Sequence, residues 1–290
     1  MATGLQILID ALLLAGIYAI GALGFALIWG VLNVLNIAYG AFIMLGGYLS
    51  YFLWKAGIDP LLTIPIVMSA LFAIGYATQE FLFKNVIGGP ASLGISLSYG
   101  LNLLCVGLVL YFLSAEYRSI TTPDYLRGYV VVFGAKLTLA RIATILIALT
   151  LTAAVWIFVD RTELGAAIRA TRLDPEAARL VGIRIGPIFN LTAGISGALA
   201  GAMGALITLV YSASPGMGDQ YLLQILVVTV LGGLGSLIGP LIGALIVGFA
   251  SSATANIFGA TYSMLVGMAI VWVALILFPN GILGRRFYET

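Results

Sequence analysis

The sequence predicts an all-α, polytopic bundle of transmembrane helices, about eight or nine spans, with broken or re-entrant helices among them. Hydrophobic residues make up 62% of the 290 residues, and charged residues only 8%. A soluble domain carries about 25% charged residues and about 45–50% apolar ones. No soluble core can hide this much apolar surface, so the surrounding solvent must be lipid. We expect one membrane domain over residues 1–290.

Uncharged stretches set the number of spans. Residues 11–54 hold no charge, and 44 helical residues measure about 66 Å against a hydrocarbon core of about 30 Å. Two passes are required, with a break near Gly30–Gly40, where Asn33, Asn36 and Gly40 interrupt the apolar pattern.

Later spans follow the same rule and are expected at 61–83, 91–113, 141–159 and 187–211. The 65 uncharged residues of 220–284 require three passes, or two with a re-entrant piece. The interruption is the glycine-rich stretch 232–240, and a last span is expected at 262–279.

The segment 114–140 is expected to form an external loop, because five charged residues and Pro123 interrupt its apolar character. Within it, the runs 129–133 and 136–139 flank a glycine turn at Gly134, which predicts a small β-hairpin near 129–139.

The segment 160–186 has the opposite character. The chain has 13 basic and 11 acidic residues, and nine of these 24 lie between positions 160 and 184, five of them arginine. Short arginine-rich loops remain in the cytoplasm, so this loop is expected there, as is the C-terminus with Arg285 and Arg286. Counting five spans back from the loop gives an external N-terminus.

A short capped helix is predicted inside this loop. Asp174 can accept hydrogen bonds from free backbone N–H groups, and Pro175 fits the first helical position. Glu176 suits the positive end of the helix dipole, and Gly182 suits a left-handed stop. Such a rigid element can transmit force from a partner, or it can be a solvated loop helix that only satisfies the topology.

The pattern Glu176-Ala-Ala-x-x-x-Gly182 resembles the EAA loop of ATP-binding-cassette (ABC) importer permeases. The glycine-rich run 229–248, Pro279–Gly284, Arg169–Arg172 and Ile17–Gly21 are similar, in order, to the branched-chain amino-acid permeases of the Liv family. One difference bears on the substrate. Family members often carry Ala-His-Gly-Glu where this chain has Ala38–Ala41, and the family also includes urea, amide and aromatic-acid importers.

The resemblance implies a permease subunit in a bacterial inner membrane, in contact with lipid. Its partners would be two cytosolic ATPases that carry the ATP, a second, related permease, and an external substrate-binding protein. The residues implied in coupling to the ATPase are Arg169, Arg172, Asp174, Pro175, Glu176, Ala177, Ala178, Arg179, Leu180 and Gly182. The small Ala178 is expected to allow the partner to approach closely.

Two further groups of residues are singled out by type. Small residues that recur every four positions allow helices to pack closely; we assign packing or helix breaking to Gly197, Gly201, Gly232, Gly233, Gly235, Gly239 and Gly243. Unpaired polar side chains are costly in hydrocarbon, so either a substrate path or bonds between helices would explain Asn33, Asn36, Tyr39, Ser96, Ser98 and Asn102.

Other classes of function are disfavoured. No Gly-Lys-Ser/Thr sequence occurs, so we expect no ATP or other cofactor on this chain, and nothing indicates nucleic-acid binding. Without histidine and with Cys105 as the one cysteine, neither a metal site nor an enzyme nucleophile with its base is expected. The alternative is an ion-coupled secondary transporter or a channel. Coupling usually requires an acid deep in the membrane, whereas Asp10, Glu80 and Asp219 are expected near span ends.

Overall fold

The computed structural model describes residues 2–86, 89–132, 135–233, 236 and 238–259, with single residues beyond. The first half of this part consists of α1 (Ala2–Leu32), α2 (Ala38–Lys55), α3 (Pro60–Phe81), the 3-10 turn η1 (Phe83–Asn85), α4 (Ala91–Leu113), α5 (Asp124–Arg127), β1 (Tyr129–Val132) and β2 (Ala135–Thr138). The second half consists of α6 (Leu139–Arg161), α7 (Glu163–Leu173), α8 (Pro175–Leu180), α9 (Ile185–Val210), α10 (Met217–Gly232) and α11 (Gly239–Ile257).

The protein is a multi-pass membrane protein. Among the described residues six helices are long and apolar enough to cross a membrane, in α1, α3 with η1, α4, α6, α9 and α11. The helix α2 has 18 residues and α10 only 16, about 24 Å, which is less than a full hydrocarbon core. The all-α polytopic class is confirmed. The span predicted at 262–279 falls almost entirely outside the described residues.

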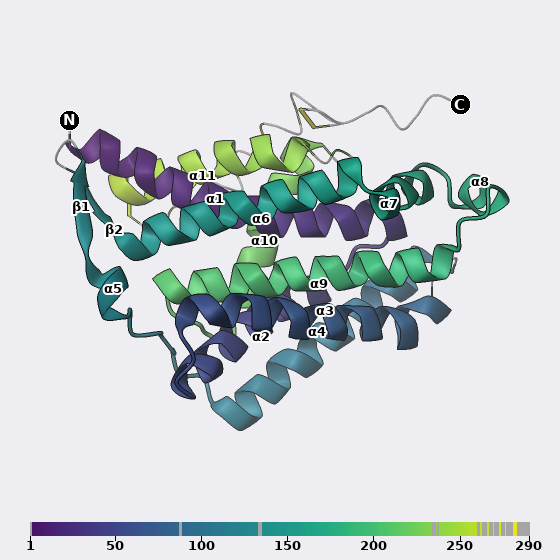
Figure 1. Cartoon of the computed structure of the whole chain (residues 1–290), viewed down its shortest axis with the longest axis horizontal. Helices are drawn as coiled ribbons and strands as arrows, with labels where there is room; N and C mark the ends of the chain where they lie inside the picture. Colours follow the sequence, from purple (N-terminus) through teal and green to yellow (C-terminus); the bar gives the residue numbers. More distant parts are fainter. Residues whose placement is uncertain are drawn as a thin grey trace.

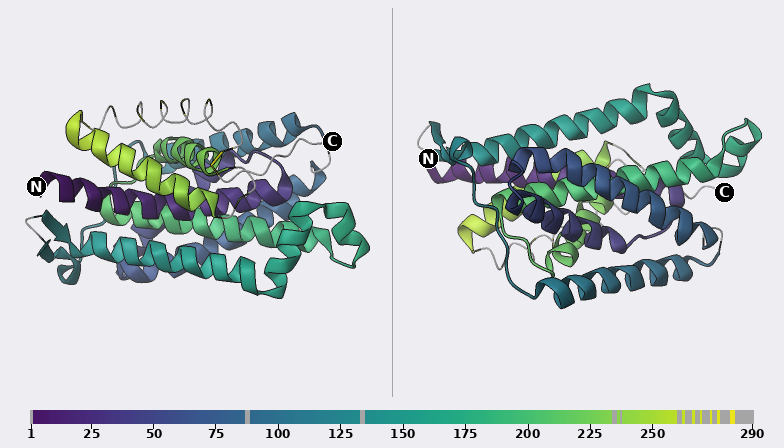
Figure 2. Two further views of the ribbon diagram at one scale, coloured as in Figure 1. Left: turned by 90° about the horizontal axis from the view of Figure 1, so that it is seen from above. Right: turned by 60° about the horizontal axis from the view of Figure 1, so that its bottom comes forward.

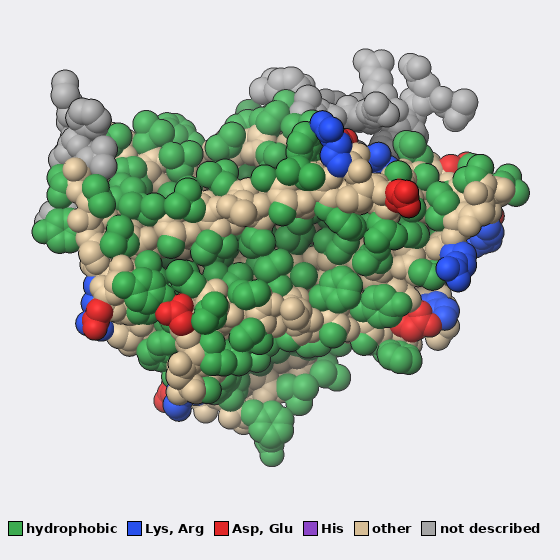
Figure 3. Space-filling view, viewed as in Figure 1, with side chains coloured by type: hydrophobic (Ala, Val, Ile, Leu, Met, Phe, Trp, Pro, Cys, Tyr) green, Lys and Arg blue, Asp and Glu red, His purple; other side chains and the backbone are tan. Residues whose placement is uncertain are grey.

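The long helices run along the longest axis of the molecule (Figure 1). The start of α1 and the hairpin β1–β2 lie at one end, and α7 and α8 lie at the other (Figures 1 and 2). The loops predicted as external and cytoplasmic are therefore at opposite ends, as the predicted topology requires. On the face drawn in Figure 3 the middle is largely hydrophobic, and most charged side chains gather toward the two ends.

The hairpin predicted near 129–139 is confirmed. Its strands pair antiparallel, from Tyr129 opposite Thr138 to Val132 opposite Ala135. Leu139 already belongs to α6, and its N–H donates to the carbonyl of Gly128 at 2.9 Å. The hairpin therefore leads directly into the next span.

The first long apolar stretch is broken as predicted, between Leu32 and Ala38. Asn33 adopts a left-handed conformation with φ of 51°, and its N–H still donates to the carbonyl of Trp29 at 2.9 Å. Asparagine tolerates this conformation better than most residues, so Asn33 ends α1 without leaving its own N–H unpaired.

The centre of the bundle is α9, whose most apolar window is 89% buried. Glycines bring it close to α3 and α2: a Cβ on Gly197 would overlap the carbonyl oxygen of Leu71, and one on Gly46 would stand 2.6 Å from the Cα of Gly201. Such contacts without side chains maximise packing where lipid provides no hydrophobic driving force between helices.

The glycine-rich interruption lies between α10 and α11. A Cβ on Gly232 would overlap the backbone of Gly239, and a Cβ on Gly243 would overlap the carbonyl of Val228. Gly233 ends α10 with a φ of 105°. These contacts fold α11 back against α10, while Gly235 lies outside the described residues.

Candidate functional site: the charged end and the helix break

The turn from α6 into α7 is tight and locally specified. The Thr162 hydroxyl accepts from the N–H of Gly165 at 3.0 Å and so caps α7. A side chain at Gly165 would overlap the last carbonyls of α6. The guanidinium of Arg169 donates to the carbonyl of Val159, which ties α7 back to the end of α6. The loop therefore has a fixed shape rather than a solvated, open one.

The short helix α8 forms with the predicted capping residue at its start and the predicted glycine at its end. Oδ1 of Asp174 accepts from the N–H groups of Glu176 at 2.9 Å and Ala177 at 3.0 Å, and Pro175 occupies the first turn. Gly182 follows with a φ of 90°, which glycine adopts without a Cβ penalty. Its N–H donates to the carbonyl of Arg179 at 3.1 Å and closes the helix end.

The tip of this loop is apolar although it stands among charges. Leu180 is 89% exposed, and Leu173 and Val181 are also strongly exposed. The ion pair between Arg179 and Glu176, 3.4 Å long, joins two exposed side chains and adds little stability. Exposed leucine and valine side chains on a short, fixed helix, away from the hydrophobic middle of the molecule, are typical of a protein contact surface.

Ala178 faces its own chain rather than the exposed side of α8. It is only 4% exposed, and its carbonyl accepts from the N–H of Ile183 at 3.1 Å. The small side chain therefore serves the packing of α8 against its own chain. The residues available to a partner are Leu180 and its exposed neighbours, which the sequence pattern did not single out above the rest of the motif.

The candidates at the first break separate into three roles. Asn33 is exposed and ends α1. The Tyr39 hydroxyl donates to the carbonyl of Gly21 at 2.8 Å, and its ring meets Phe25 edge-on at 5.6 Å, so Tyr39 packs the core. Asn36 is buried, and among the described residues its Oδ1 has no hydrogen-bond partner.

The candidates on α4 are also divided. Ser96 lies on the exposed face. Ser98 is fully buried and donates to Ile95 in its own helix at 2.9 Å and toward the carbonyl of Leu35 in the break at 3.3 Å. Asn102 Nδ2 donates to Oδ1 of Asp219 on α10 at 3.1 Å. The break, α4 and the start of α10 are thus brought together.

Asp219 lies in the first turn of α10, near a helix end as expected. Its partner Asn102 is nevertheless the central residue of α4, so α10 begins level with the middle of that helix. Sequence reasoning missed this acid. The signal was the turn-rich sequence Ser212–Gly218 directly before it, which permits the chain to turn back into the membrane.

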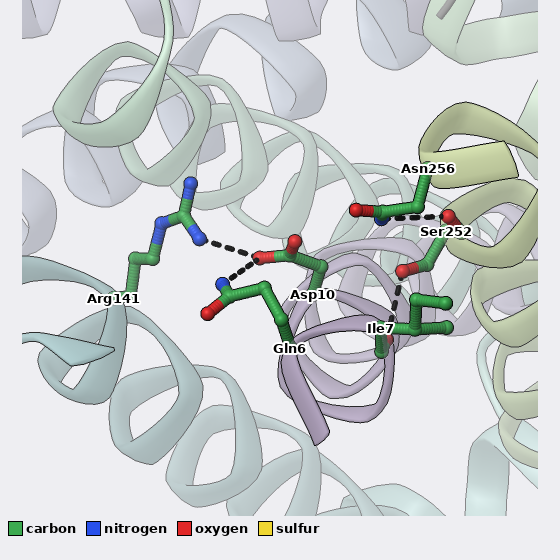
Figure 4. Close-up of polar contacts among 6 residues, drawn as sticks. All are labelled: Gln6, Ile7, Asp10, Arg141, Ser252 and Asn256. Carbon is green, nitrogen blue, oxygen red and sulfur yellow. Dashed lines mark hydrogen bonds and ion pairs between the residues drawn. The ribbon is translucent and has the colours of Figure 1, made fainter. Parts of the chain in front are cut away.

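Asp10 has a different role (Figure 4). Its Oδ1 accepts from Arg141 of α6 at 2.5 Å and from Gln6 at 3.4 Å, and nearby the Ser252 hydroxyl of α11 donates to the carbonyl of Ile7 at 2.8 Å. These bonds join α1, α6 and α11 at the end of the molecule opposite α7 and α8. Asp10 therefore has a structural role, and we call this group of bonds the clamp.

A multi-pass bundle with a rigid, apolar-tipped loop at one end and a break beside buried polar groups belongs to the class of transport permeases. The family described as "Branched-chain amino acid transport system / permease component" matches residues 7–275, and the chain belongs to that family. It is a permease subunit of the ABC importer type, and the secondary-transporter and channel alternatives are not supported.

Curated relatives agree along almost the whole chain. The permease protein BraD of a high-affinity branched-chain amino acid transport system from Pseudomonas aeruginosa is 27% identical, over 98% of this chain and 97% of its own. LivH from Escherichia coli K12 is also 27% identical with the same coverage. Among solved structures, PsaBC from Streptococcus pneumoniae in complex with Fab matches 95% of this chain and 93% of its own, with a TM-score of 0.54 and 14% identity, which shows a shared fold.

Proposed function

We propose that this chain is one of two permease subunits of an ATP-driven importer in a bacterial inner membrane. The pair of permeases would bind two cytosolic ATPases, this chain through its α7–α8 end, and an external binding protein would deliver a branched-chain amino acid or a related small amide. The second permease is a related chain. ATP binding would pull the α7–α8 end and alternate the access of the path beside the helix break.

The observation that carries this proposal is the apolar tip formed by Leu173, Leu180 and Val181 on the capped helix corner. Apolar side chains exposed to water gain free energy when a partner covers them, about 25 cal/mol per Å². The charged side chains of Glu176 and Arg179 flank the tip and would orient the partner. A merely solvated loop has no need of this arrangement.

Stiffness is the second requirement for coupling, and the loop meets it. The Asp174 cap, the Thr162 cap and the bond from Arg169 to Val159 fix α7 and α8 to each other and to α6. Because α7 and α8 are held rigidly, a force applied to them moves the helices to which they are attached. A flexible loop would change its own shape instead and would not move those helices.

The branched-chain substrate is supported by the family and by relatives named for branched-chain amino acid transport. The test is purification of the tagged chain from its own membrane, followed by identification of the attached subunits and measurement of ATP-dependent uptake of leucine in proteoliposomes. We expect an ATPase and a second permease at equal stoichiometry. A chain that purifies alone and carries out uptake without ATP would contradict the proposal.

A further inference from the structure

A carboxylate lies level with the middle of a helix that is long enough to span the membrane. Asn102 stands eleven residues from each end of α4, which is about 16 Å along the helix axis. Its amide nitrogen donates to Asp219 at 3.1 Å, so the Asp219 carboxylate lies at the same depth. Asp219 is nevertheless an exposed residue of this chain.

The backbone explains how the acid reaches this depth. Ala213 and Arg118 exchange backbone hydrogen bonds of 2.7 and 2.9 Å, and Arg118 follows the end of α4 at the outer part of the molecule. Asp219 lies six residues after Ala213, in the first turn of α10, and its bond with Asn102 places it beside the centre of α4. The segment between them therefore descends from the outer end to the centre of α4.

An exposed carboxylate at this depth cannot face acyl chains without a large desolvation cost. In membrane proteins such acids face a water-filled cavity or a neighbouring subunit. The face of α4 and α10 that carries Asp219 is therefore turned away from lipid, toward an aqueous space on its own or one shared with the second permease.

Two buried acceptors belong to the segments that meet here. Asn102 is 3% exposed and Asn36 is 5% exposed, and within the described residues Oδ1 of each has no hydrogen-bond partner. The orientation of the Asn102 amide is fixed, because its nitrogen is the atom that donates to Asp219. A buried acceptor without a donor is destabilising and is usually satisfied by a ligand or water.

A side-chain hydrogen bond and a close backbone approach hold these segments together. Ser98, one turn before Asn102, bonds toward Leu35, which adjoins Asn36. On the other side a Cβ on Gly40 would stand 2.8 Å from the carbonyl oxygen of Gly218, the neighbour of Asp219. The start of α2, the centre of α4 and the start of α10 therefore converge on one place.

We propose that Asp219, Asn102 and Asn36 form a site on the transport path that binds the ammonium group of the passing substrate. One carboxylate and two amide oxygens offer only acceptors with one negative charge, which matches an ammonium group and disfavours a carboxylate anion. This inference rests on the proposed function and makes it more specific: the site selects a zwitterionic amino acid over urea, a neutral amide or an aromatic acid.

The decisive variant is Asp219→Asn. Asparagine keeps an acceptor oxygen for the Asn102 nitrogen, so a mere tie between α4 and α10 would survive, but the negative charge would be lost. Asp219→Glu restores the charge. The matched control is Glu80→Gln, because Glu80 also accepts from an asparagine, Asn190, at 2.5 Å, and sits at the end of α3.

The measurement is the initial rate of ATP-driven leucine uptake by the whole importer in proteoliposomes, at equal amounts of co-purified ATPase. We expect Asp219→Asn to lower the rate at least tenfold, Asp219→Glu to recover part of it, and Glu80→Gln to change it less than twofold. Wild-type rates in Asp219→Asn, or an equal loss in Glu80→Gln, would overturn the ammonium site.

Two further outcomes separate this inference from the proposed function. A wild-type importer that moves acetamide or urea and not leucine, with ATP, overturns the ammonium site and leaves the importer standing. Leucine uptake that depends on Asp219 and needs no ATP would contradict the proposal of an ATP-driven importer, while the proposed ammonium-binding site would stand.

Discussion

The side chain of Arg172 in α7 lies against Gly30 near the end of α1. A Cβ built on Gly30 would stand 2.9 Å from Nε and 3.1 Å from Cδ of Arg172. Gly30 is three residues before Asn33, where α1 is broken. The corner that we propose to bind the ATPase therefore contacts the helix whose break leads to the buried polar groups, without an intervening element.

This contact predicts a graded effect of side-chain size at Gly30. Gly30→Ala should be tolerated, because the arginine side chain is flexible and can shift by a few tenths of an ångström. Gly30→Leu should displace Arg172 and lower the number of leucine molecules imported per ATP hydrolysed by several-fold, with the importer still assembled. The matched control is Gly4→Leu in the same helix, where a Cβ meets nothing within 4 Å. An unchanged ratio in Gly30→Leu would exclude this contact from coupling.

The exposed tip yields a second prediction. Leu180→Asp should weaken ATPase co-purification at least tenfold, since burying a leucine contributes about 1.5–3 kcal/mol and each 1.4 kcal/mol is about tenfold in affinity. Val131→Asp is the control, because Val131 is also exposed but lies on the hairpin at the opposite end. Equal retention of the ATPase by both variants would show that the tip is not the docking surface.

Neighbouring alanines in α8 separate packing from docking. Ala178→Asp would place a carboxylate in the chain's own interior, and we expect it to lower the free energy of unfolding by about 1–3 kcal/mol. Ala177→Asp, the same change on the exposed side, should leave the melting temperature within about 2 °C. Thermal unfolding of the detergent-solubilised chain measures both, and identical melting temperatures would contradict the burial of Ala178.

These variants also show what the sequence could predict. The break at Asn33, the Asp174 cap, the Gly182 stop and the hairpin depend on residues a few positions apart, and all formed where their local chemistry places them. The burial of Ala178 and the depth of Asp219 depend on how distant segments pack. Periodicity and charge spacing do not contain that information, so neither feature could be predicted from the sequence.

The outer loop provides a pH-dependent prediction. The Tyr125 hydroxyl donates to Oδ2 of Asp59 at 2.5 Å and ties α5 to the start of α3. Burial, together with this bond and the Asp59 charge, raises the pKa of Tyr125 to about 12. Because a tyrosine ionises near pH 10 when unfolded, the stabilisation is complete below about pH 10 and is lost as the pH rises toward about 12. Protease cleavage within 114–128 should accelerate over that range, and the Tyr125→Phe variant should lack this pH-dependent step.

The clamp between Asp10 and Arg141 supports the last prediction. Both side chains are about three-quarters buried, with 24% and 30% exposure, and their bond joins α1 to α6. Removing one partner leaves the other charge largely buried without its counter-ion, so Asp10→Asn or Arg141→Met alone should lower the free energy of unfolding by about 1–3 kcal/mol. In the double variant no unpaired charge remains, so the combined loss should be smaller than the sum of the two single losses by about 0.5–2 kcal/mol. The free energies of unfolding of the wild type, the two single variants and the double variant are measured by thermal unfolding in one detergent at constant ionic strength. Additive losses would show that the two groups stabilise the fold independently, and Asp10 would then be free for a role in transport.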